Sequence, residues 1–235
     1  MEHTPSPGTN SLRRPEVRAT LDHLHRAARG DWRHFLGILP GMLLGLLRGR
    51  SFDQALTPHA ARKVYMPISR EQGHFLYLVG RTLGARRAVE FGTSFGISTI
   101  YLASAIRDNG GEIVIGTELE PSKHQQAVAN VKGAGLEDVT DIRLGDALQT
   151  LREVPEPIDL VLLDGWKDLY LPVLGLLKPR LRPGAVVLAD NIFTFKKSLR
   201  PYVEHMQCGE YGFESTTLSI SDGFEYSVYL GEESS

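Results

Sequence analysis

Over most of its length the chain alternates short apolar runs with longer amphipathic segments. The runs Ile158 to Asp164 and Ala185 to Asn191 are nearly all apolar, which is typical of strands covered on both faces of a parallel sheet. Shorter runs rich in valine, isoleucine and threonine also have strand character. Seven strands are therefore expected, at residues 87–91, 112–118, 140–145, 158–164, 185–191, 213–219 and 224–230.

The amphipathic segments between these strands have the period of a helix. They cover residues 71–83, 98–106, 122–133, 147–153, 170–181 and 198–206. Strands and helices in alternation predict an α/β fold with a doubly wound, seven-stranded and mostly parallel sheet. Only the turn Ser221-Asp222-Gly223 separates the last two strands, so the last strand is expected to run antiparallel.

The N-terminal part divides into two segments that precede the α/β domain. Residues 1–15 are rich in Pro, Ser, Gly and Thr and are expected to form a disordered tail. Residues 16–65 are predicted to form a helical extension, broken near Gly30 and Pro40, and residues 66–235 to form the α/β domain.

An apolar run within this extension, Phe35 to Leu47, is too short to span a bilayer, so no stable membrane insertion is expected. The run could rest on a membrane surface, given the arginines at its edges. Packing against the domain or a second copy of the chain is favoured, because apolar helix faces usually bury against protein. This predicts a homodimer formed through the N-terminal helices.

The amino-acid composition limits which kinds of binding partner and which cellular location are expected. The 235 residues carry a net charge of −2, with 42% hydrophobic and 23% charged residues, as in ordinary soluble globular proteins. This near-neutral balance gives no electrostatic reason to expect nucleic acid as a partner. The single cysteine, Cys208, excludes an internal disulfide and fits a reducing compartment. Since no secretory signal is visible, a cytoplasmic location is expected.

The stretch Val89 to Thr99 is the candidate ligand-binding turn. It carries Gly92 and Gly96 in the pattern E-x-G-x-x-x-G, with hydroxyl groups at Ser94 and Ser98. Glycine permits a sharp turn and a close approach of a ligand, and the N–H groups of the following helix then face that ligand. The spacing differs from the G-x-G-x-x-G of dinucleotide folds. An ordinary strand-to-helix turn can have the same composition, so the motif alone leaves both interpretations open.

Acidic residues follow the next two strands. In open α/β sheets, ligands bind beyond the carboxyl ends of the strands. Glu118 follows the second strand, where a carboxylate can accept both hydroxyls of a ribose; a surface glutamate is the alternative. Asp146 follows the third strand and could either accept the amino group of an adenine or cap the helix behind it.

Three oxygen-bearing side chains end the fourth and fifth strands, Asp164 on one and Asp190 with Asn191 on the other. Two carboxylates buried side by side are costly unless a cation lies between them. Oxygen ligands suit Mg²⁺, with Mn²⁺ or Ca²⁺ as substitutes, although a pair of helix caps would show the same spacing. Lys167 lies three residues beyond Asp164, where a lysine of lowered pKa could remove a proton from a hydroxyl; a solvated surface lysine is the alternative.

The segments Ile158 to Pro172 and Gly184 to Ile192 contain a D-x-W-K-D-x-Y-L-P string and an A-D-N string. They resemble catechol O-methyltransferase and the wider family of metal-dependent small-molecule O-methyltransferases. The likeness covers Met66 to Gly231. It implies an S-adenosylmethionine-dependent enzyme that methylates a hydroxyl group of a small molecule.

The resemblance also implies a role for each matching residue. Asp164, Asp190 and Asn191 correspond to the Mg²⁺ ligands, and Lys167 corresponds to the general base that deprotonates the acceptor. The residues that the resemblance and the strand-end positions together place at the cofactor are Met66, Glu90, Gly92, Ser94, Gly96, Ser98, Glu118, Asp146, Ala147, Asp164 and Trp166.

The chain departs from the mammalian catechol enzyme at three places. Gly165 stands where that enzyme has a histidine near the adenine. Thr216 falls where it has a glutamate that contacts the second catechol hydroxyl, which weakens the case for catechol itself as the substrate. Residues 1–65 match only in being helical, and this segment is expected to carry most of the acceptor specificity.

These features predict methyl transfer to an oxygen of a catechol-like or vicinally oxygenated molecule, since two adjacent oxygens would chelate the metal. The alternatives are a metal-independent N-methyltransferase, a nicotinamide-dependent oxidoreductase on a similar sheet, and a non-catalytic cofactor-binding module. The absent dinucleotide fingerprint disfavours the oxidoreductase. The combination of Asp164, Lys167, Asp190 and Asn191 argues against a non-catalytic module.

Overall fold

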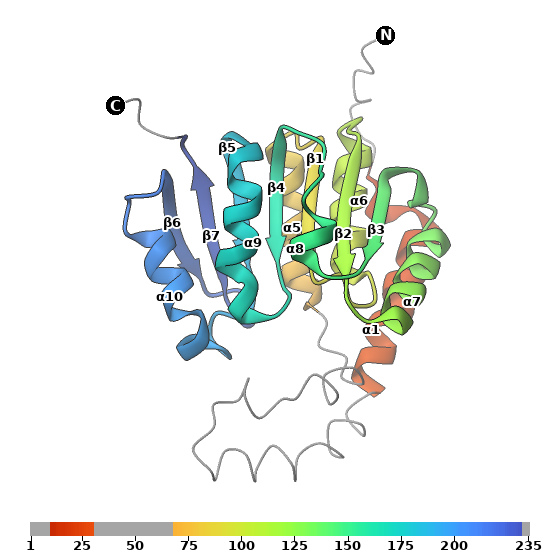
Figure 1. Ribbon diagram of the computed structural model, residues 1–235. Helices are drawn as coiled ribbons and strands as arrows, with labels where there is room; N and C mark the ends of the chain where they lie inside the picture. Colours follow the sequence, from red (N-terminus) through yellow and green to blue (C-terminus); the bar gives the residue numbers. More distant parts are fainter. Residues whose placement is uncertain (1–9, 31–67, 232–235) are drawn as a thin grey trace, which may run out of the picture.

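A seven-stranded sheet forms the centre of the computed structural model, which describes residues 10–30 and 68–231 (Figure 1). The strand order is β3-β2-β1-β4-β5-β7-β6. The strands are β1 (Arg87–Phe91), β2 (Ile113–Glu118), β3 (Thr140–Leu144), β4 (Ile158–Leu163), β5 (Leu181–Ala189), β6 (Phe213–Leu218) and β7 (Phe224–Tyr229).

The strand directions confirm the fold class expected from the sequence. β1 pairs in parallel with β2 and β4, β2 with β3, and β4 with β5. β7 runs antiparallel between β5 and β6, so the last strand of the chain is the one that reverses. The parallel strands therefore share one edge for their carboxyl ends, the lower edge in Figure 1.

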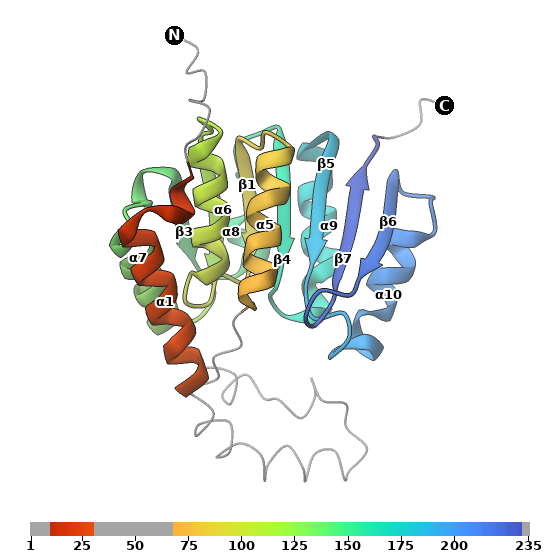
Figure 2. The ribbon, with the colours of Figure 1, turned by 180° about the vertical axis from the view of Figure 1, so that it is seen from behind.

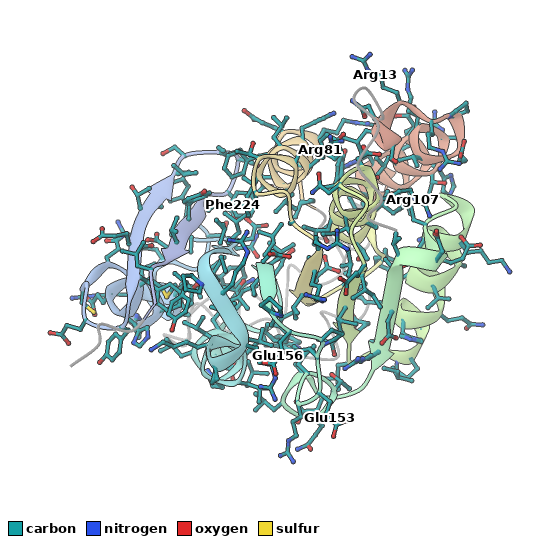
Figure 3. The ribbon with its side chains drawn as sticks, turned by 90° about the horizontal axis from the view of Figure 1, so that it is seen from above. Arg13, Arg81, Arg107, Glu153, Glu156 and Phe224 are labelled. Atoms are coloured by element: carbon teal, nitrogen blue, oxygen red, sulfur yellow. The ribbon has the colours of Figure 1, made fainter. Side chains whose placement is uncertain are left out.

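Helices cover both faces of this sheet (Figures 1 and 2). One apolar core includes side chains of α1, α5, α6 and α7, and the other includes those of α8, α9 and α10. In Figure 3, Arg81 and Arg107 lie on one side of the sheet and Glu153 and Glu156 on the other. The helices are α1 (Pro15–Gly30), α5 (Arg70–Thr82), α6 (Ile97–Asp108), α7 (Pro121–Gly133), α8 (Ala147–Thr150), α9 (Tyr170–Leu177) and α10 (Lys196–Gln207).

Two predicted helices are too long. The helix expected over residues 147–153 ends at Thr150. The segment expected to be helical to residue 181 ends as an α-helix at Leu177, and a short 3-10 helix, Lys178–Arg180, follows. Pro179 lacks an N–H group and so cannot continue the α-helical hydrogen bonds. β5 accordingly begins at Leu181, which pairs with Ile158, rather than at residue 185.

The predicted disordered tail is wrong for residues 10–15. A 3-10 helix spans Ser11–Arg13 and leads directly into α1. Ser11 is buried, and its N–H and hydroxyl donate to the Asp108 carboxylate at the end of α6 at 2.8 and 2.6 Å. α1 itself agrees with the predicted helical extension.

Several expectations lie outside the described residues. They concern residues 1–9, the break near Pro40, the apolar run Phe35 to Leu47 and the cofactor contact of Met66. In residues 10–30 and 68–231, no helix has the length and apolar character needed to cross a membrane.

Candidate cofactor and metal site

The turn between β1 and α6 depends on its two glycines. Gly92 has φ of 98° and Gly96 has φ of 85°, a region that favours glycine. A Cβ atom at Gly92 would lie 2.6 Å from the backbone nitrogen of Gly165, so the turn passes directly against the loop that follows β4. Gly96 precedes α6 without a side-chain cap, which leaves the first turn of that helix suited to ligand oxygens.

Glu90 lies fully buried on β1, beside this turn. Its Oε2 accepts hydrogen bonds from the hydroxyls of Thr93 at 3.0 Å and Thr99 at 2.5 Å. Its Oε1 is also buried but has no hydrogen-bond partner among the described residues. Burial raises the pKa of Glu90, and the hydroxyls of Ser98, Thr99 and Thr93 oppose that shift. A buried carboxylate oxygen without a donor would be stabilised by a cationic hydrogen-bond donor.

The carboxylate of Glu118, at the end of β2, is held by two backbone groups. Oε2 accepts from the N–H of Ser94 at 2.7 Å, and Oε1 accepts from the N–H of Glu120 at 2.9 Å. Each oxygen keeps a second lone pair for a further donor, such as a ribose hydroxyl. The hydrogen bond from Ser94 therefore links Glu118 to the glycine turn along the carboxyl edge of the sheet.

The predicted adenine contacts occupy different environments. Asp146 caps α8, because its Oδ1 accepts from the N–H of Leu148 at 2.9 Å. The helix-cap alternative is thus the observed one, and an adenine contact stays a prediction. Ala147 is buried in the core beneath α8, whereas Trp166 is 36% exposed.

Asp164 and Asp190 are brought together by the pairing of β4 with β5. Burial raises the pKa of Asp164, and Lys167 opposes the shift. Burial also raises the pKa of Asp190, and the nearby charge of Asp164 adds to the effect. A largely buried carboxylate beside a buried one, whose charge it destabilises, forms the environment that a cation would stabilise.

Asn191 completes this group at a left-handed backbone position, with φ of 66°. Its Nδ2 donates to Oδ2 of Asp222 at 3.2 Å. The described residues contain no cluster of three or more His, Cys, Asp and Glu side chains arranged for a metal ion. The predicted set is of another kind, with two carboxylates and one amide oxygen, which suits a hard cation that keeps several waters.

Lys167 is a largely buried lysine rather than a solvated one, since its side chain is 9% exposed. Its Nζ donates to the hydroxyl of Tyr170 at 2.8 Å and to Oδ1 of Asn191 at 2.6 Å. Oδ1 of Asp164 lies 3.6 Å from the same nitrogen. Burial lowers the pKa of Lys167, and Asp164 and Asp190 oppose the shift. The amine thus lies directly beside the predicted metal ligands.

Comparison with known proteins decides the family. A family model described as a methyltransferase domain matches residues 89–192. The catechol O-methyltransferase of Niastella koreensis is 33% identical over 136 residues, which cover 56% of this chain and 61% of that protein. Catechol O-methyltransferase B of Danio rerio is 31% identical over 184 residues, which cover 72% of this chain and 68% of that protein. The chain belongs to the catechol O-methyltransferase family.

A solved structure agrees with this membership. The O-methyltransferase TomG from Streptomyces achromogenes, solved in complex with SAM, superposes with a TM-score of 0.66 and 27% identity. The superposition covers 74% of this chain and 86% of TomG. The resemblance and the fold class predicted from the sequence are therefore both confirmed. The match to the Niastella koreensis protein spans only 61% of its length, however.

Sequence reasoning missed several residues of this catechol O-methyltransferase family site. Each of them shares a hydrogen bond with a predicted residue: Gln72, Thr93, Thr99, Tyr170 and Asp222. Gln72 and Asp222 are remote in sequence from their partners, whereas the other three lie within nine positions of theirs. Ser69 and Gln72 have the S-x-x-Q spacing of a capping box, which could have indicated the start of α5. That spacing gives no sign of the contact between Gln72 and Asp190.

Proposed function

We propose that this chain is an S-adenosylmethionine-dependent O-methyltransferase that acts, with Mg²⁺, on a small molecule carrying two adjacent oxygens. The single observation that carries the proposal is the convergence of Asp164, Asp190 and Asn191 around the buried amine of Lys167. The names of the relatives, catechol O-methyltransferase in both cases, support the same reaction class.

The glycine turn supplies the proposed cofactor site. Glu90 offers the cofactor's amino group a buried Oε1 that has no partner in the part of the chain that the structure describes, and Glu118 offers lone pairs to the ribose. Gly92 leaves the turn free of a Cβ atom where it passes the loop after β4. These groups would hold the methyl donor over the carboxyl edge of the sheet, next to Asp164.

Asp164, Asp190 and Asn191 would hold the metal ion. When bound, Mg²⁺ polarises the acceptor hydroxyl and lowers its pKa. The burial of Asp190 and the near-burial of Asp164 favour this role, because an ionised carboxylate pair in a low-dielectric setting gains most from a cation.

Lys167 is the proposed general base. Tyr170 and Asn191 hold its Nζ in place, and burial favours the neutral amine that can accept a proton. Nζ would take the proton of the acceptor hydroxyl. The oxygen would then form a bond to the methyl carbon as the bond from that carbon to the cofactor sulfur breaks, which leaves S-adenosylhomocysteine as the second product. Alignment of the two reactants is expected to supply several kcal/mol of the rate acceleration.

The identity of the acceptor depends on residues around this edge. Thr216 lies on β6 opposite Tyr226, at the position where the mammalian catechol enzyme has a glutamate. The proposal is therefore an acceptor of the catechol-like or vicinally oxygenated class rather than catechol alone. A cytoplasmic location and a homodimer formed through residues 16–65 accompany this proposal as predictions.

Methyl transfer from labelled S-adenosylmethionine to a panel of catechols and vicinal hydroxycarbonyl compounds tests the function. Transfer is expected with Mg²⁺, to be lost in excess EDTA, and to return when Mg²⁺ is restored. Undiminished transfer in EDTA would contradict the metal role. A thermal shift with S-adenosylhomocysteine but none with NAD would exclude the oxidoreductase, since only a true ligand stabilises the fold.

A further inference from the structure

We infer that Gln72 is a positioning residue for the metal site, one that holds the carboxylate of Asp190 in place. The inference rests on the proposed function, because it assigns to Asp190 the role of metal ligand. Gln72 lies in the first turn of α5, whereas Asp190 follows β5, 118 positions later in the chain.

The carboxamide of Gln72 is buried, with 2% of the residue exposed. Its Oε1 accepts a hydrogen bond from the backbone N–H of Ser69 at 2.9 Å, and the hydroxyl of Ser69 accepts from the N–H of Gln72 at 3.1 Å. This reciprocal pair is a capping box at the start of α5. The bond to Ser69 requires a carbonyl oxygen on that side, so it determines which way the amide faces.

The other end of the amide therefore presents its N–H groups to Asp190. Nε2 of Gln72 donates to Oδ1 of Asp190 at 2.5 Å. The backbone N–H of Asn191 donates to the same oxygen at 2.7 Å. Oδ2 of Asp190 accepts only from Nδ2 of Asn191, at 3.3 Å, among the described residues, so it has more lone-pair capacity for an ion than Oδ1 with its two donors. Gln72 thus holds the carboxylate of Asp190, a proposed metal ligand, in a single orientation.

This arrangement has a physical reason. Asp190 is 2% exposed, and a buried carboxylate without hydrogen-bond donors is costly. Hydrogen bonds from neighbouring groups to metal-binding carboxylates orient them, and their loss typically lowers metal affinity about 10- to 100-fold. Among the described residues, Gln72 is the one donor to the Asp190 carboxylate that comes from another element of the fold, since the other donor, Asn191, follows Asp190 directly in sequence.

Two variants separate this role from the capping of α5. Gln72→Met keeps a side chain of similar length but removes both side-chain hydrogen bonds. Ser69→Ala removes the hydroxyl of the capping box but keeps the backbone N–H that orients the Gln72 amide. The full chain is titrated with Mn²⁺ alone by electron paramagnetic resonance, and with S-adenosylhomocysteine alone by calorimetry.

The expected result is a loss of Mn²⁺ affinity of about tenfold or more in Gln72→Met, with the affinity for S-adenosylhomocysteine within about twofold of the parent. Ser69→Ala is expected to bind both like the parent. Parent-like Mn²⁺ affinity in Gln72→Met, an equal loss in Ser69→Ala, or a parallel loss of S-adenosylhomocysteine affinity would each overturn the inference. A parent protein that binds no Mn²⁺ would overturn the proposed metal role as well.

Discussion

Nζ of Lys167 donates a 2.6 Å hydrogen bond to Oδ1 of Asn191, which joins the loop after β4 to the loop after β5. The oxygen of Asn191 that is proposed to bind the metal ion therefore also accepts a hydrogen bond from the proposed base, Lys167. Under the proposed function, an ion held by Asn191 would compete with the amine for this oxygen. Binding of the ion would then free Nζ to receive a proton from the acceptor.

Replacement of Lys167 by alanine is expected to lower turnover by about 10²-fold or more, because general-base catalysis typically contributes that much. The affinity for S-adenosylhomocysteine should change little, since the amine contacts Asn191 and Tyr170 rather than the glycine turn. Steady-state kinetics and calorimetry on the same preparation measure the two effects. Lys132→Ala, an exposed position on α7, is the matched control. Parent-like turnover in Lys167→Ala would remove the base assignment.

The stabilisation given by Mg²⁺ is expected to increase with pH. The folded protein raises the pKa of Asp164 and of Asp190, so their contribution to stability is greatest when both are protonated. That contribution falls as the pH rises from the ordinary carboxyl range through the raised values. Mg²⁺ requires the ionised forms and offsets this loss. Melting temperatures measured with and without Mg²⁺ should therefore differ more at about pH 8 than at about pH 5. An equal shift at both values would contradict the coupling.

The Glu90→Gln variant is expected to bind S-adenosylhomocysteine roughly 10- to 100-fold more weakly, as hydrogen bonds to charged groups contribute about 1.5–3 kcal/mol. The reason is the buried Oε1, which is unpartnered among the described residues and suits an ammonium group. Adenosine lacks the amino-acid part of the cofactor, so its affinity should stay close to that of the parent. Calorimetry with both ligands measures the difference. If the two affinities fell together, Glu90 would have a general structural role instead.

Alanine at Gly92 is expected to destabilise the fold by more than the roughly 1–2 kcal/mol typical of a left-handed residue. Its Cβ would lie 2.6 Å from the backbone nitrogen of Gly165, in addition to the unfavourable φ. Gly84→Ala is the matched control, because Gly84 also has positive φ but has nothing within 4 Å of an added Cβ. Urea unfolding of both variants measures the difference. Equal losses of stability would show that the close approach at Gly92 is easily relieved.

The periodicity of the sequence determined the succession of strands and helices along the chain, and with it the fold class. Apolar runs such as Ile158 to Asp164 need cover on both faces, a local property that predicts a parallel sheet. The same apolar runs end at Asp164 and near Asp190, which predicts that both residues lie at strand ends. Parallel pairing then brings these strand ends to one edge of the sheet. The family resemblance rested on the segments around these residues.

The tertiary structure alone decided which groups hold those residues in place. Gln72 and Asp190 lie 118 positions apart, and Ser11 and Asp108 lie 97 apart, so no local pattern relates them. Oε1 of Glu90 is left without a partner in residues 10–30 and 68–231, which likewise follows from how α6 and the glycine turn close over β1. Periodicity reports which face of an element is buried, whereas a hydrogen bond between distant segments depends on how the elements pack at the scale of single atoms.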